Sequence, residues 1–189
     1  MLCAIMKYVA MTAALLAFPS GALAQQATGT INLTGTVTGR CSVVGGGQAF
    51  SETINLGELS GNDGRLRADL TDASPDAIRS FSLVCTSATP RVELSATRLS
   101  TGTTAPTGYA NNIDYTAQVA VLQASGTPPQ ITYTTASSLP APTNVQLTAP
   151  LANTADNVTI RVYSFGTEAG ALLVAGSYSS VIHVTISPS

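Results

Sequence analysis

The sequence predicts an all-β protein, a β-sandwich in which two sheets enclose one core, and three observations indicate this fold class. Thr, Ser, Ala, Val and Gly dominate the composition, as is typical of strands and turns. About eight short segments alternate apolar with polar residues and are separated by turn residues. No stretch keeps the 3.6-residue apolar period of a helix. The 189 residues suffice for a single domain with one sizeable core.

The first alternating segment covers residues 29–41. Ile31, Leu33, Gly35 and Val37 would lie on one face of an extended strand, with Thr and Asn on the other. A two-residue period buries its apolar face only against another sheet. This segment is therefore expected either to complete its own domain or to insert into another one.

The other predicted strands follow in chain order, separated by turns rich in Gly, Pro, Asn and Asp. They cover residues 53–59, 66–70, 78–85, 91–96, 113–121, 158–164 and 176–187, with short edge strands near 131–134 and 145–147 in a stretch rich in Pro and Thr. In the last strand one apolar face would be formed by Tyr178, Ile182, Val184 and Ile186.

Residues 1–24 are expected to be a secretory leader. Lys7 provides a basic start, residues 8–18 form a short apolar run, and Ala22-Leu23-Ala24 is a typical cleavage site, so Gln25 would begin the mature chain. The run is too short to span a bilayer, and no later segment supplies the roughly 20 apolar residues that a membrane helix needs. The mature chain is thus expected outside the cytoplasm, without a membrane span.

Charge and cysteine usage narrow the chemistry further. From residue 25 onward, seven arginines stand against ten acidic residues, a net charge of −3, which does not favour nucleic acid or acidic membranes. Cys3 falls in the leader, so Cys41 and Cys85 remain, and in an exported chain they are expected to form a disulfide.

Neither a catalytic site nor a metal site is expected. His183 is the only histidine, lies within a predicted strand and points away from the Tyr178 and Ile182 face. Acidic residues such as Asp63, Asp72 and Asp76 occur in turns, where short acidic side chains favour the turn itself. No nucleophile or metal-binding motif occurs. We therefore expect no enzyme activity, no cofactor and no metal.

Several of these segments, in this order, resemble pilin subunits of the chaperone-usher pathway, most closely the archaic type, the spore coat U-like domain family. The matching features are the leader, the G-T-I-x-L-x-G-x-V segment leading to Cys41, INLGELSG, FSLVC with Cys85, ANNIDYTAQV and the terminal AGSYSSVIHVTISPS. The resemblance covers nearly all of the mature chain.

The resemblance implies an immunoglobulin-like β-sandwich, residues 35–189, that lacks its final strand. An open groove would lie beside the last strand, bordered by Tyr178, Ile182, Val184 and Ile186. Residues 25–34 would be the donor strand for a neighbouring subunit, with Gly29 approaching closely and Ile31 and Leu33 filling groove pockets.

In function, the resemblance implies a structural subunit of a pilus or fimbria that polymerises by donor-strand exchange, for adhesion and biofilm formation. Its partners would be a periplasmic chaperone, an outer-membrane usher and other pilus subunits, identical or different, and it would be exported through the periplasm to the cell surface. The alternative is a self-contained secreted coat or binding module, in which residues 29–37 are simply the first strand of a complete sandwich.

Overall fold

A computed structural model describes residues 30–70, 77–136 and 141–189. Within these ranges the chain forms strands and turns and no α-helix, so an all-β fold is confirmed. The chain divides into two compact units, with the boundary in the sequence between Gly35 and Thr36. All the described strands belong to the second unit. The predicted leader, Gln25, Gly29 and the acidic turn at Asp72 and Asp76 lie outside the described residues.

The larger sheet is built on two long antiparallel strands, β10 (Val158–Gly166) and β7 (Asn112–Val121). β2 (Ile78–Phe81) pairs with the free side of β10, while β5 (Leu99–Ser100) and β8 (Gln130–Thr134) pair with β7. Alternate residues of β7 are buried, as expected for a strand with one face toward the core.

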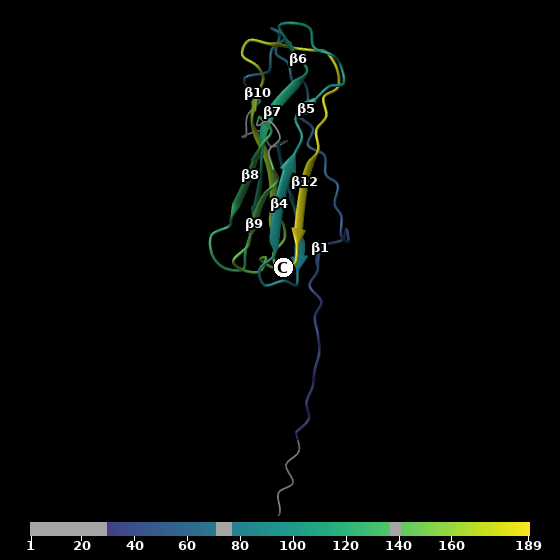
Figure 1. Ribbon diagram of the computed structural model, residues 1–189, viewed down its shortest axis with the longest axis vertical. Helices are drawn as coiled ribbons and strands as arrows, with labels where there is room; N and C mark the ends of the chain where they lie inside the picture. Colours follow the sequence, from purple (N-terminus) through teal and green to yellow (C-terminus); the bar gives the residue numbers. More distant parts are fainter. Residues whose placement is uncertain (1–29, 71–76, 137–140) are drawn as a thin grey trace, which may run out of the picture. The chain divides into compact units, whose positions relative to one another are not determined.

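The smaller sheet has the order β12-β4-β9, all antiparallel. Its strands are β12 (Ile182–Ser187), β4 (Arg91–Ala96) and β9 (Thr143–Gln146). β8 of the larger sheet lies beside β9, so the two sheets approach each other on that side (Figure 1).

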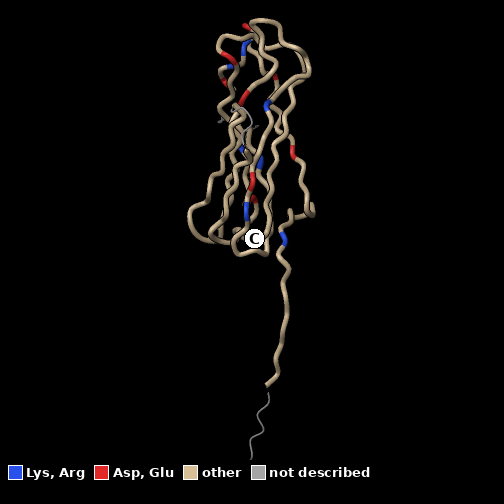
Figure 2. Tube along the Cα trace, in the orientation of Figure 1, with Lys and Arg blue, Asp and Glu red and all other residues tan. Residues whose placement is uncertain are grey.

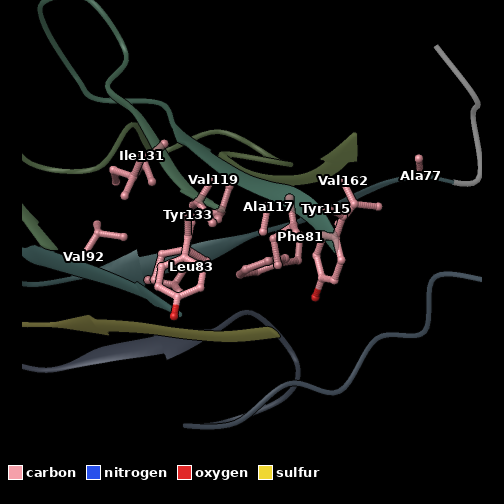
Figure 3. Close-up of a cluster of buried hydrophobic side chains, with 14 of the residues drawn as sticks. Ala77, Phe81, Leu83, Val92, Tyr115, Ala117, Val119, Ile131, Tyr133 and Val162 are labelled. Atoms are coloured by element: carbon pink, nitrogen blue, oxygen red, sulfur yellow. The ribbon is translucent and has the colours of Figure 1, made fainter. Parts of the chain in front are cut away.

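The inward faces of the two sheets share one hydrophobic core. Figure 3 shows Phe81, Tyr115 and Tyr133 among the side chains that fill this space. The most completely buried positions lie on the central strands β4, β7 and β10, namely Val92, Leu94, Ile113, Ala117, Val119, Val121 and Val158. The central strands therefore hold the fully buried positions, whereas β12, at the edge, contributes only partly buried side chains.

Two further strand pairs complete the fold. β1 (Cys41–Val43) pairs with β3 (Leu83–Cys85), and β6 (Tyr109–Ala110) runs parallel to β11 (Leu172–Leu173). Cys41 and Cys85 face each other directly in the first pair and form a disulfide, which confirms the predicted pairing.

The structure corrects several predicted strand boundaries. Residues 30–40 form no strand, and the first strand begins only at Cys41. Residues 53–59 and 66–70 form no strand either; an isolated bridge between Ser60 and Leu66 is the regular pairing there. The last strand begins at Ile182 rather than at residue 176. The long central strands lie where they were predicted.

Charged residues are sparse on the described part of the chain, and Figure 2 shows no run of basic residues along any strand. No helix in the described ranges has the length and hydropathy that a membrane crossing requires.

Replacing both cysteines by serine is expected to lower the free energy of unfolding by about 4 kcal/mol. The bond closes a separation of 44 residues, and a loop of that length restricts the unfolded chain by about this amount. Urea unfolding followed by circular dichroism measures the difference. A reductant should destabilise the unaltered chain alone; equal stability of the two chains would contradict the prediction.

A buried asparagine ties β10 to β3 and is expected to be important for stability. The Asn157 side chain is 1% exposed; its Oδ1 accepts from the Leu83 N–H at 2.8 Å, and its Nδ2 donates to the carbonyls of Leu83 and Ala152, each at 2.7 Å. Asn157→Ala leaves these groups without partners, so the free energy of unfolding should fall by about 3 kcal/mol. Asn144→Ala, on the exposed face of β9, is the matched control and should change it by less than about 0.5 kcal/mol.

Candidate functional site

The candidate site begins with the unpaired edge of β12. Just before this strand, the Thr97 N–H donates to the Val181 carbonyl at 3.0 Å, so Val181 and Thr97 form a hydrogen-bonded pair of the ladder. Such pairs alternate along an antiparallel ladder. The backbone groups of Ile182, Val184 and Ile186 therefore point away from β4, toward an edge where no described strand pairs.

The same three residues direct their side chains toward the core. Ile182, Val184 and Ile186 pack against the core cluster but stay only half-buried, whereas their partners on β4 include the fully buried Leu94 and Val92. An edge strand that presents both apolar side chains and unpaired backbone groups favours association with another strand.

A groove of about 570 Å³ lies beside the beginning of β12. One wall is formed by Tyr178, Ile182 and their neighbours, and the other by residues 50–56. The floor comes from the larger sheet and includes Leu99, Tyr115, Ile160, Val162 and Phe165. The two sheets, which approach each other at β8 and β9, thus leave a gap at their other side.

The second wall, residues 50–56, forms no strand and contacts Arg79 and Phe81 of β2. The Phe50 ring stacks on Phe81 with a centroid distance of 4.2 Å, and Ile54 and Leu56 pack against the core. On one side of the groove, β12 has a strand partner on only one of its two edges among the described residues. On the other side, residues 50–56 pair with no described strand.

Hydroxyl groups mark the groove near Tyr178. A hydrogen bond of 2.6 Å joins Tyr115 of β7 to Ser180, which lies in the segment just before β12, and the Tyr115 ring stacks on Phe165. Burial raises the pKa of the Tyr115 hydroxyl, although the Ser180 contact opposes part of this effect. The single Tyr178 O–H is within hydrogen-bonding distance of two carbonyls, at 2.9 Å from that of Val174 and 3.1 Å from that of Ala110, and desolvation raises the pKa of Tyr178 as well.

Of the predicted site residues, Tyr178 and Ile182 line this groove, while Val184 and Ile186 continue the same face of β12 beyond it. In the first unit, Ile31 and Leu33 are 86% and 89% exposed, within an extended stretch that forms no strand. Gly29 lies outside the described residues. His183 is exposed, as expected, and pairs with Ser95.

The sequence did not identify residues 50–56, Tyr115 and Phe165 as parts of a site. Ile54 and Leu56 alternate and were interpreted as a strand, which reveals their apolar face but not the missing pairing. Tyr115 has the phase of an ordinary core residue, so no sequence signal distinguishes it from its neighbours on β7.

Chemically, the groove offers apolar side-chain pockets and backbone hydrogen-bonding groups, which suit an extended peptide. Among the described residues, no cluster of His, Cys, Asp or Glu could hold a metal ion. No protein-family model, curated protein or solved structure matches the chain.

The buried Tyr115 hydroxyl should make stability depend on alkaline pH. Because its pKa is raised in the folded state, its contribution is complete below the unfolded value of about 10 and is lost as pH rises through the folded value. Urea unfolding from about pH 8 to about pH 11 should therefore show a steeper loss of stability for the unaltered chain than for Tyr115→Phe. Equal slopes would contradict this expectation.

Proposed function

We propose that this protein is a structural subunit of a chaperone-usher type pilus or fimbria, which polymerises by donor-strand exchange. The observation that carries the proposal is the β12 edge, where unpaired backbone groups and half-buried apolar side chains border an open groove. In this proposal the two sheets are an immunoglobulin-like sandwich that lacks one strand, and the missing strand comes from another copy or another subunit.

The occupant we propose is the segment of residues 25–34 of a neighbouring subunit. Its described part has alternating apolar side chains, and Ile31 and Leu33 are almost fully exposed. If each of them removes about 100 Å² of apolar area in the groove, the two contribute on the order of 5 kcal/mol. Hydrogen bonds to the β12 edge would add to this.

Export through the periplasm and assembly at the cell surface follow from the same proposal. An uncovered groove next to an unpaired strand promotes aggregation, so a periplasmic chaperone would cover it before an outer-membrane usher exchanges it for the next subunit. Because one subunit gives a segment and receives another, the contacts do not close and yield a filament suited to adhesion and biofilm formation. The subunit acts as a building block in this proposal and has no catalytic role or cofactor.

Deleting residues 25–34 from the mature chain tests the proposal. The intact mature chain is expected to form head-to-tail oligomers whose masses are multiples of the subunit mass, and the deletion variant at the same dilution should lack this series, because the donor is lost while the groove remains. Light scattering and sedimentation measure the sizes. Oligomers that persist in the deletion variant would exclude this donor segment.

A synthetic peptide of residues 25–37 tests the groove from the other side. At about 100 times its dissociation constant it should stabilise the mature chain, diluted until monomeric, by about 2.7 kcal/mol. A peptide with Ile31→Asp and Leu33→Asp should not stabilise the chain, whereas the matched peptide with Thr30→Asp and Asn32→Asp, on the opposite face, should. A monomer that gains nothing from any peptide would favour the self-contained secreted module instead.

A further inference from the structure

A polar contact joins the second wall of the groove to the larger sheet. Within the described residues, the hydrogen bond from Arg79 Nε to the Thr53 carbonyl, at 3.0 Å, is the one that links residues 50–56 to another element. The same guanidinium donates through a terminal nitrogen to the Ile78 carbonyl at 2.7 Å. The remaining attachment of this wall is apolar, through Phe50, Ile54 and Leu56.

Arg79 has an unusual place for a charged residue. In β2 it shares the inward phase of Phe81, is only partly exposed, and belongs to the lining of the groove. An arginine at the border of an apolar core is favoured where its planar group meets fixed acceptors. The carbonyl of Thr53 provides such an acceptor next to β2, which is the edge strand of the larger sheet.

The direction of this hydrogen bond determines which backbone groups remain for an occupant. Consecutive residues of an extended chain direct their backbone groups to opposite sides. The Thr53 carbonyl is directed at the Arg79 guanidinium, so this carbonyl is not available to an occupant of the groove. On the opposite wall, the backbone groups of Ile182 point away from β4 and remain available.

We propose that Arg79 is a positioning residue for the donor strand: it holds residues 50–56 along β2 so that an inserted strand pairs with β12 on one side and meets a fixed second wall on the other. This inference rests on the proposed function, because the occupant is the same donor segment. Without Arg79, the wall would lose the Thr53 hydrogen bond and would be held less firmly, so the inserted strand would dissociate faster.

The test uses the full mature chain, diluted until monomeric, and a labelled peptide of residues 25–37. Arg79→Ala should weaken peptide binding about tenfold, mainly through faster dissociation, as expected for the loss of one hydrogen bond to a charged group. Arg79→Lys, which keeps the charge and a donor, should recover part of the affinity. Arg91→Ala, an exposed arginine on β4, is the matched control and should bind like the unaltered chain.

Limited proteolysis and hydrogen exchange of the chain without peptide distinguish positioning from a general structural role. Arg79→Ala should accelerate cleavage after Glu52 by a glutamate-specific protease and leave the exchange of the β10 amides unchanged. Faster exchange throughout β2 and β10, or unaltered peptide binding by Arg79→Ala, would overturn the inference. A peptide that fails to bind even the unaltered chain would refute the proposed function, whereas equal binding to that chain and to Arg79→Ala would refute only the role of Arg79.

Discussion

The hydrogen-bonding requirement of the β12 backbone is the constraint on which the site depends. β12 is paired on one side by β4, and the groups of Ile182, Val184 and Ile186 face a side with no described strand. The side chains of these three residues point inward but stay only half-buried. The same three positions therefore lack both a backbone hydrogen-bond partner on one side and full burial of their apolar side chains. Water can hydrogen-bond the exposed backbone groups, but it cannot replace the apolar contact, and a strand supplies both at once.

The all-β fold tolerates this open edge because its most buried contacts lie elsewhere. The completely buried side chains lie on β4, β7 and β10, the Asn157 contacts join β10 to β3, and the disulfide joins β1 to β3. None of these interactions involves the groove between β12 and residues 50–56. Local opening at a weakly packed edge costs less free energy than global unfolding, so in the proposed function this edge would exchange partners while the core stays folded.

Most of the fold could be predicted from residue patterns, whereas the site could be predicted only in part. Alternation located β4, β7 and β10, and the two cysteines that follow the predicted leader indicated their own pairing. Alternation states which face of a segment is apolar, but not which edge is paired, so residues 53–59 were interpreted as a strand although they form none. The roles of Asn157 and Arg79 depend on carbonyls distant in the chain, and single-residue patterns carry no information about such contacts.

The segment around Ile31 and the groove around Ile182 both expose apolar surface when neither has a partner. Exposed Ile and Leu side chains on the segment, and half-covered apolar side chains on the strand, each leave apolar surface in water. Inserting one into the other removes both exposures in a single event and adds a strand to the sheet edge. Every subunit would carry one donor segment and one groove. When the segment of one subunit fills the groove of the next, a segment and a groove remain free at the two ends of the pair. Head-to-tail association would therefore continue along a filament and would not stop at a dimer.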